Sequence, residues 1–267
     1  MPGLKGSVAV IMLFQIAALF IREFVRLRLE QAGTPPHLAK DQSAWFGFVV
    51  LIMLMWPYWW HHRARLASAF GRPAKWFGLI LTSVAIGVST RITSWGVTFV
   101  KASLPANYIH GDWVSFETGP LWQCPDAGPL LLAIVTMTVA TPAIEEVINR
   151  GYILGAFVRR NLPFPALFSA GLFAVLHRPD GMIAAFLFGI VVAVQMPHCR
   201  SLWGPIIAHS TFNMLFIVDS DCLRYPELEA ALLTLPALKL GALGVCTGVA
   251  SFLIALRIAG WTGAAAP

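Results

Sequence analysis

The sequence predicts an all-α, polytopic transmembrane helical bundle, and three observations indicate this fold class. Hydrophobic residues make up 57% of the 267-residue chain, and its mean hydropathy is +0.71. Asp, Glu, Lys and Arg make up only 12%, whereas soluble domains usually carry about 25% charged residues. The apolar residues also gather in long runs. A soluble fold could not cover its surface with so few charged side chains, so we expect the apolar surface to face lipid.

Eight apolar segments are candidates for membrane spans. Crossing the hydrocarbon core takes roughly 20 apolar residues in a helix. The segments that approach this length are residues 7–22, 44–60, 76–100, 128–158, 164–178, 181–197, 202–218 and 236–257. The fifth to the seventh are short, so we expect them to pack inside the bundle or to continue into helical extensions. The chain has no internal repeat or long linker, and we expect one integral membrane domain over residues 1–267, with about eight spans.

Basic residues lie in short clusters between the apolar runs, as the positive-inside rule describes for cytoplasmic loops. Residues 61–75 carry four Lys and Arg and no acid, whereas 102–127 and 219–235 are acidic. This pattern predicts that both termini are cytoplasmic, and it argues against nucleic-acid binding despite the net charge of +6. Residues 22–44 disagree, because they are basic yet would lie outside. Either they lie along the membrane interface or the first helix is miscounted.

The four cysteines show no CxxC pair or other zinc-like spacing, which argues against a cysteine metal site. Cys124 and Cys222 fall one in each of the two acidic loops. In a bacterial cell those loops would face an oxidising compartment. We therefore hypothesise that Cys124 and Cys222 form a disulfide.

Three segments place ionisable or amide side chains inside apolar spans, where such groups are functional candidates by default. In chain order they are Glu145, Glu146 and Arg150, then His177, and then His209 and Asn213. Counting about 1.5 Å of rise per residue from the cytoplasmic ends of the spans, we place Glu145, His177, His209 and Asn213 in one slab of the membrane. That slab can hold a polar, water-containing pocket.

Helical spacing sorts these residues further. Glu146 and Arg150 are four residues apart, so they share a helix face and can form an ion pair. Glu145 points about 100° away from Glu146, which leaves it free to face a cavity. His209 and Asn213 are also four residues apart and can present two polar groups to one point.

The residue types suit hydrolysis by an activated water. A carboxylate and a histidine that share a water form a general base while the water attacks a carbonyl. A second histidine and an asparagine amide can donate to the oxyanion that develops. Ser210 adjoins His209 but lies on a different face of the helix. We therefore expect water, and no side chain, to be the nucleophile.

In this order, the patterns Glu-Glu-x-x-x-Arg (145–150), Phe-x-x-x-His (173–177) and His-x-x-x-Asn (209–213) resemble the CAAX protease and bacteriocin-processing (CPBP, or Abi) family. The resemblance covers about residues 128–218, which would be the catalytic core. Gly151 matches the Arg-Gly continuation that is common in the family. Asn149 departs from it, because the family usually has an apolar or aromatic residue there.

The resemblance implies a membrane-embedded glutamate endopeptidase that needs no cofactor. Glu145 and His177 would activate water, His209 and Asn213 would stabilise the oxyanion, and the pair formed by Glu146 and Arg150 would support them. The substrate would be a membrane-anchored protein with a prenylated tail, a peptide, or a C-terminal sorting signal. The expected location is a prokaryotic plasma membrane.

Three other interpretations stay open. A zinc-dependent protease could use Glu145, His177 and His209 as metal ligands, although the chain has no His-Glu-x-x-His pattern. A transporter could use the carboxylates as a proton relay, but we find no inverted repeat. The third alternative is a non-catalytic immunity or scaffold protein. Arg91, inside the third span, is expected to reach the interface or to pair with an acid.

Overall fold

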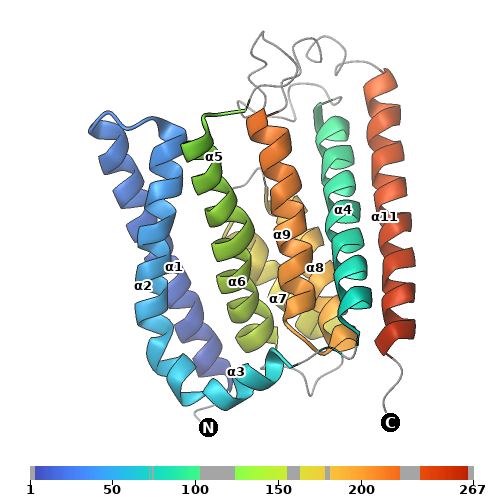
Figure 1. The fold of residues 1–267 in the computed structure, drawn as a ribbon, viewed down its shortest axis with the longest axis horizontal. Helices are drawn as coiled ribbons and strands as arrows, with labels where there is room; N and C mark the ends of the chain where they lie inside the picture. Colours follow the sequence, from blue (N-terminus) through green and yellow to red (C-terminus); the bar gives the residue numbers. More distant parts are fainter. Residues whose placement is uncertain are drawn as a thin grey trace.

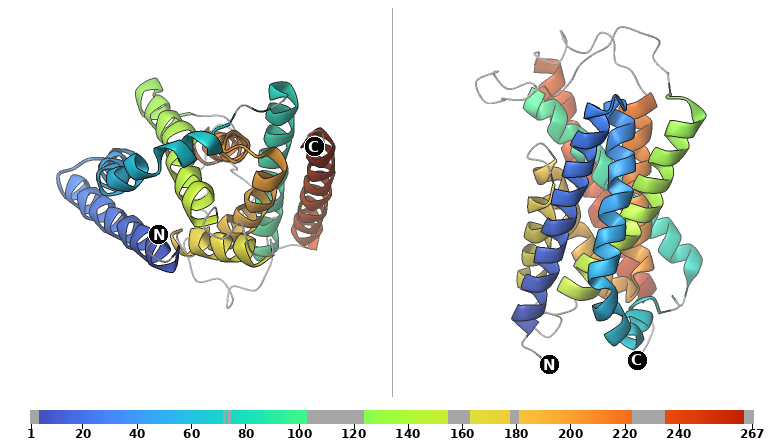
Figure 2. Two further views of the ribbon diagram at one scale, coloured as in Figure 1. Left: turned by 90° about the horizontal axis from the view of Figure 1, so that it is seen from below. Right: turned by 90° about the vertical axis from the view of Figure 1, so that its left-hand side faces the viewer.

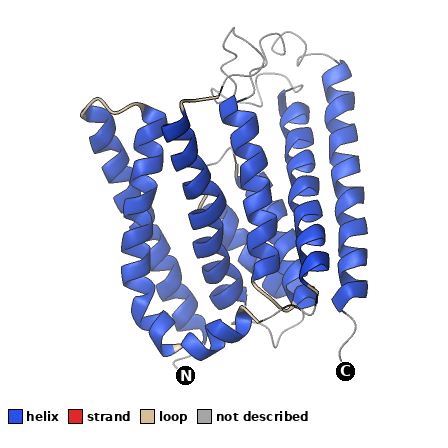
Figure 3. Cartoon of the chain, viewed as in Figure 1, coloured by secondary structure: helices blue, strands red, loops and turns tan. Residues whose placement is uncertain are grey.

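The structure is a computed structural model that describes residues 4–71, 73, 75–102, 124–154, 163–177, 181–222 and 235–263. Within these ranges every regular element is a helix (Figure 3). The long helices are α1 (Leu4–Gln31), α2 (Pro36–His61), α4 (Trp76–Ala102) and α11 (Leu235–Gly263). A fifth long element, which we call the glutamate rod, joins α5 (Ala127–Ile134), the π-helical η2 (Val135–Ala140), α6 (Thr141–Glu146) and the π-helical η3 (Val147–Leu154).

The remaining described helices are shorter. They are α3 (Arg63–Ala69), α7 (Pro163–Val175), α8 (Met182–Cys199) and α9 (Trp203–Ile217), which the π-helical η4 (Val218–Cys222) continues. In the described residues, five helices are long and apolar enough to cross a membrane. They are α1, α2, α4, the glutamate rod and α11, and α7 and α8 are apolar but shorter. The predicted all-α, polytopic bundle is confirmed, as is the shortness of the fifth to seventh spans.

The first helix is longer than its apolar run predicts. It continues to Gln31, so the basic residues expected in a loop after residue 22 are largely on the helix itself. Arg26 forms ion pairs with Glu23 and Glu30, one turn away on either side. Two acids therefore offset the charge of Arg26. Of the two explanations for the basic segment 22–44, the structure supports a first helix that extends beyond its apolar run. Figure 1 shows the two ends of the chain at the same end of the bundle, where α3 also lies.

Small residues bring the short helices close to their neighbours around the bundle centre. A Cβ added to Gly87 of α4 would lie 2.5 Å from the carbonyl oxygen of Ala208 in α9. A Cβ added to Gly189 of α8 would lie 2.9 Å from Cα of Ala170 in α7. Without hydrophobic association between helices in lipid, such close backbone packing holds a membrane bundle together. Both contacts therefore fix helices that carry or surround the candidate site residues.

A disulfide joins Cys124 and Cys222, and their Cα atoms are 4.0 Å apart. This separation lies well inside the limit of about 7 Å for a bridge, so the predicted pairing is confirmed. Cys124 lies three residues before the glutamate rod, and Cys222 ends η4 at the continuation of α9. The bond therefore ties together the two elements that carry both glutamates, His209 and Asn213.

Arg91 is buried in α4 and forms an ion pair with Asp219 of η4. The indole Nε1 of Trp95 donates a second hydrogen bond to the same carboxylate, at 2.8 Å. The expectation that Arg91 pairs with an acid is therefore confirmed. These contacts hold η4 against α4 near the disulfide.

Candidate active site

The candidate residues come from three parts of the bundle. Glu145 and Glu146 end α6, and Arg150 follows in η3. His209 and Asn213 lie on α9, while His177 lies two residues beyond the end of α7. In Figure 1 the glutamate rod and α9 run side by side, and α6 and α9 are in contact.

Glu146 is fully buried, and it has two partners. Its Oε1 lies 2.8 Å from Nδ1 of His209 and accepts a hydrogen bond from Nη1 of Arg150 at 3.3 Å. Nε of Arg150 lies 3.1 Å from Oε2 of Glu146, as an ion-pair contact without hydrogen-bond geometry. The predicted ion pair is confirmed, and Glu146 also connects α6 to α9.

Arg150 is 1% exposed, and its remaining contacts lock it in place. Its Nη2 donates to the carbonyl oxygen of Gly189 at 3.2 Å, and its guanidinium carbon lies 4.8 Å from the ring centre of Phe173. A buried cation is retained only when it is paired and hydrogen-bonded. The guanidinium of Arg150 in turn lies beside the buried carboxylate of Glu146 as its ion-pair partner.

The contact with Glu146 fixes which nitrogen of His209 carries a proton. An ionised carboxylate can only accept hydrogen bonds, so Nδ1 of His209 must be the donor. The imidazole is 4% exposed, and the rings of Phe188 and Phe173 lie 4.8 and 5.9 Å away from it. When His209 is neutral, its Nε2 therefore presents a lone pair towards Glu145.

Glu145 differs from Glu146 in its surroundings. Its side chain is 28% exposed, and its Oε2 lies 4.0 Å from Nε2 of His209. This distance is too long for a direct hydrogen bond. Oε2 is shielded from solvent and has no hydrogen-bond partner among the described residues. A carboxylate oxygen in that situation can accept a hydrogen bond from a water or a substrate group.

His177 is held by the helix that precedes it. Its Nδ1 donates to the carbonyl oxygen of Phe173 at 2.8 Å, and the two rings are 4.6 Å apart. Nε2 is therefore the nitrogen with a free lone pair when His177 is neutral. Among the described residues no hydrogen bond joins His177 to Glu145 or His209. Phe173 also lies against the His209 ring, and no such ring contact joins His177 to His209 among the described residues.

Asn213 is buried, and its Nδ2 donates to the carbonyl oxygen of Met137 at 2.7 Å. The π-helix explains why that carbonyl is available. In a π-helix an N–H donates to the carbonyl five residues earlier, as Thr141 at the end of η2 does to Thr136. The N–H that would serve Met137 belongs to residue 142, which is a proline and has none. Asn213 supplies the missing donor, a role that our sequence reasoning missed although Pro142 was the signal for it.

No group of three His, Cys, Asp or Glu side chains in the described part of the chain has a metal-binding arrangement. The three ligands of the zinc interpretation, Glu145, His177 and His209, are thus not gathered into such a group. The departure at Asn149 has a local effect, because its Nδ2 donates to the backbone carbonyl of Glu145 at 2.8 Å. This side chain therefore steadies the turn that carries Glu145.

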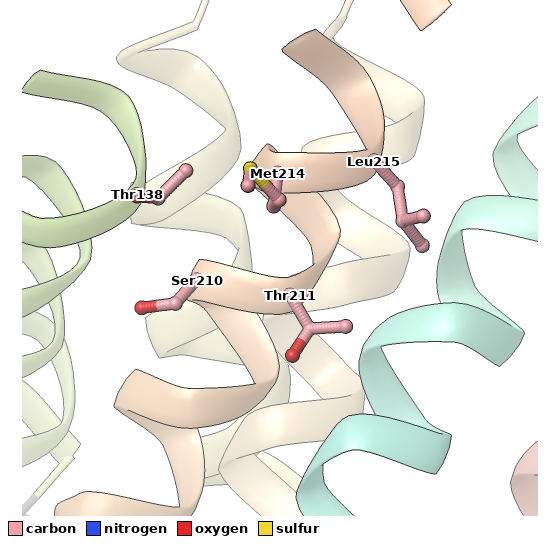
Figure 4. A pocket seen from close by; sticks show the side chains of 5 residues that line it. All are labelled: Thr138, Ser210, Thr211, Met214 and Leu215. Atoms are coloured by element: carbon pink, nitrogen blue, oxygen red, sulfur yellow. The ribbon is translucent and has the colours of Figure 1, made fainter. Parts of the chain in front are cut away.

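A cavity of about 320 Å³ lies between η2 and α9, and Figure 4 shows its lining. The lining residues are Thr138, Ser210, Thr211, Met214 and Leu215. The hydroxyls of Thr138 and Thr211 donate to backbone carbonyls of their own helices. The cavity thus begins next to His209 along α9, but neither glutamate lines it.

Comparisons with known proteins match the segment that carries these residues. A model of the type II CAAX prenyl endopeptidase Rce1-like family matches residues 127–215. A protein of Bacillus subtilis (strain 168) named "Putative membrane peptidase YdiL" is 27% identical over 89 residues, or 33% of this chain. The match covers 36% of that relative, so the chain spans about a third of its length.

Proposed function

We propose that the chain is an intramembrane endopeptidase of the CAAX protease and bacteriocin-processing family, because residues 127–215 match the model of the type II CAAX prenyl endopeptidase Rce1-like family. It hydrolyses a peptide bond near a membrane-embedded or lipidated tail of its substrate. The single observation that carries this proposal is the arrangement around His209. Its imidazole lies between Glu146, at 2.8 Å from Nδ1, and Glu145, at 4.0 Å from Nε2. One buried imidazole thus lies between a paired carboxylate and an unpaired carboxylate oxygen.

In the proposed reaction, Glu145 accepts a proton from a water molecule as the water oxygen bonds to the scissile carbonyl carbon. General-base assistance of this kind requires a carboxylate within hydrogen-bond reach of the water. Glu145 has an oxygen without a partner among the described residues, so accepting the water costs it no existing hydrogen bond. The proton then passes to the leaving amine as the C–N bond breaks, which gives a carboxylic acid and an amine.

His209 and Asn213 stabilise the charge that develops on the carbonyl oxygen. Nε2 of His209 can donate to an oxyanion only in the imidazolium form, because Nδ1 already donates to Glu146. The ionised Glu146 supports that cation, as the carboxylate does in other carboxylate–histidine pairs. Asn213 has one amide N–H left after its bond to Met137. His177, whose Nε2 carries the free lone pair, assists Glu145 once substrate brings the two closer.

The disulfide and the loop charges support a proposal for the location of the enzyme. Disulfides persist in oxidising compartments. The bond between Cys124 and Cys222 joins the segment before α5 to the end of η4, which continues α9, and Figure 1 shows these ends of α5 and α9 far from α3. The basic segment 61–75 is at the opposite end. We therefore place the basic end and both termini in the cytoplasm of a prokaryotic cell.

The substrate class is tested with the purified protein in lipid vesicles. Two peptides of the same sequence are supplied, one with a prenylated C-terminal cysteine or an apolar tail and one without either. Cleavage near the tail of the first peptide and none of the second is expected, because only the first partitions to the depth of the site. Equal cleavage of both, or cleavage of neither by folded protein, would contradict the proposal.

The same assay distinguishes the glutamate mechanism from the zinc-dependent one. Activity is measured after exhaustive chelation, with the metal content determined in parallel. We expect full activity without bound metal. Loss of activity on chelation, with recovery when stoichiometric zinc returns, would instead assign Glu145 and the histidines to a metal site.

A further inference from the structure

The helix α3 has two faces of opposite character. Its inner face, with Leu66 and Ala69, packs against Val147 and Ile206 together with Phe70, which follows the helix. Its outer face includes Arg63 and is exposed. Figure 1 and the left view of Figure 2 show α3 lying across the ends of the long helices. An amphipathic helix in this orientation lies in the plane of a membrane interface.

The inner face of α3 forms a floor beneath the candidate active site. Val147 directly follows Glu146, and Ile206 lies about one turn before His209 on α9. Backbone and side-chain hydrogen bonds also tie the end of α3 to the start of α9. The N–H of Leu202 donates to the Ala69 carbonyl at 2.8 Å, and a bond of 3.2 Å joins Ser201 Oγ to the Gly71 carbonyl. A shift of α3 would therefore also displace α9, the helix that carries His209.

The outer side of this region combines positive charge with aromatic rings. The segment 61–75 holds four Lys and Arg and no acid, and the side chains of Arg63 and Lys75 are exposed. The guanidinium carbon of Arg63 lies 4.6 Å from the ring centre of Trp60. Several tryptophans at this end are exposed, namely Trp56, Trp60, Trp76 and Trp203. Tryptophan and basic side chains are the residues typically found at the level of the lipid headgroups.

We propose that Arg63, Lys75 and Trp60, which we call the α3 platform, bind the phosphate headgroups of anionic phospholipids. The guanidinium of Arg63 can donate two parallel hydrogen bonds to phosphate oxygens. Trp60 anchors the platform at the depth of the lipid headgroups. A free phosphate ion in water would gain nothing from this anchor. Basic segments beside a membrane are attracted by anionic lipid over about a Debye length. A bound headgroup holds α3, and with it the floor of the site, against the bundle.

The test uses the full-length protein in detergent, with thermal unfolding as the readout. Short-chain phosphatidylglycerol, short-chain phosphatidylcholine, inorganic phosphate and glycerol phosphate are added separately. We expect the unfolding midpoint to rise with phosphatidylglycerol and to change little with the other three. In parallel, native mass spectrometry counts the phosphatidylglycerol molecules that stay bound. A midpoint that rises equally with phosphatidylcholine, or equally with the free phosphates, would overturn the proposal.

The matched variants are R63Q/K75Q and R28Q/K239Q, which remove the same charge from opposite ends of the molecule. Arg28 is a close match for Arg63, because its guanidinium carbon also lies over an aromatic ring, 5.3 Å from the centre of Phe24. Only R63Q/K75Q is expected to lose the phosphatidylglycerol effect and the bound lipid. Equal losses of bound lipid and of the stabilising effect in the two variants would indicate general charge attraction and would overturn the proposal.

The effect on catalysis rests on the proposed function, whereas lipid binding does not. In vesicles, kcat should rise with the fraction of phosphatidylglycerol for the wild type and stay flat for R63Q/K75Q. If no variant cleaves any tailed peptide but phosphatidylglycerol still binds, the proposed function fails and the platform stands. If peptide cleavage is normal but insensitive to anionic lipid, the link between the platform and the site floor is wrong.

Discussion

Nδ1 of His209 lies 2.8 Å from Oε1 of Glu146, across the contact between α9 and α6. Glu146 is also the partner of Arg150, so one buried carboxylate serves an imidazole and a guanidinium. The carboxylate thus sets the tautomer of the histidine while the arginine offsets its charge. Helical spacing explains the arginine contact, but only the tertiary fold explains the histidine contact.

Replacing Arg150 with alanine should destabilise the protein as well as lower its activity. The change leaves Glu146 buried and without its cation, and removing one partner of a buried pair typically costs about 3–5 kcal/mol. Unfolding of the purified variant in detergent measures the loss. Arg28→Ala, at an exposed position, is the control and should remain close to wild type. Wild-type stability of Arg150→Ala would show that the pair has no structural role.

Asn213→Ala should reduce both stability and kcat. The change leaves the carbonyl of Met137 without the donor that replaces the missing N–H of Pro142, and an unpaired buried carbonyl costs about 1–3 kcal/mol. It also removes the amide N–H proposed for the oxyanion. Thr211→Ala is the control on the same helix, because that hydroxyl donates only to a carbonyl of its own helix. Loss of kcat with unchanged stability would argue that the Met137 contact contributes little.

Much of the fold was predictable because the length of each apolar run and the difference in charge between loops can be read directly from short stretches of sequence. The eight apolar runs correspond to the long and short helices, and the acidic loops that carry Cys124 and Cys222 predicted the disulfide. The end of α1 was not predictable from hydropathy, because the ion pairs of Arg26 let the helix continue beyond its apolar run.

The candidate site was predictable within each helix but not between helices. Spacing of four residues gave the contact between Glu146 and Arg150. The contact between Glu146 and His209 joins residues 63 positions apart, and no local pattern encodes it. The π-helical turns add a further obstacle, because they change which residues share a face. The pairing of Asn213 with Met137 follows from that changed register and from Pro142.

Removing the disulfide should lower stability more than removing a free cysteine. The bond closes a loop with a sequence separation of 98, and a bridge over a loop of that size contributes about 2–5 kcal/mol. The double variant C124S/C222S is compared in unfolding experiments with C246S, which changes an exposed free cysteine. Equal stability of the two variants would contradict this expectation.

The same cysteines also test the membrane orientation. Without reductant, a thiol reagent under denaturing conditions should label Cys199 and Cys246, and after reduction it should label all four cysteines. Because Cys124 is half-buried whereas Cys222 is buried, the reduced Cys124 should react in intact cells with a reagent that does not cross the membrane. Protection of Cys124 in reduced cells, with labelling only after lysis, would place the disulfide in the cytoplasm and reverse the proposed orientation.

The most direct test of the central claim, that Glu145 takes the proton from water, is the turnover of Glu145→Gln. Glutamine keeps the shape of the side chain and most of its hydrogen bonding but cannot act as the base. The unfolding midpoint and the affinity for tailed peptide should match those of wild type, while kcat falls by about 10²- to 10⁴-fold. Glu23→Gln, at an exposed position on α1, is the control and should keep full activity. Wild-type kcat for Glu145→Gln would contradict the account.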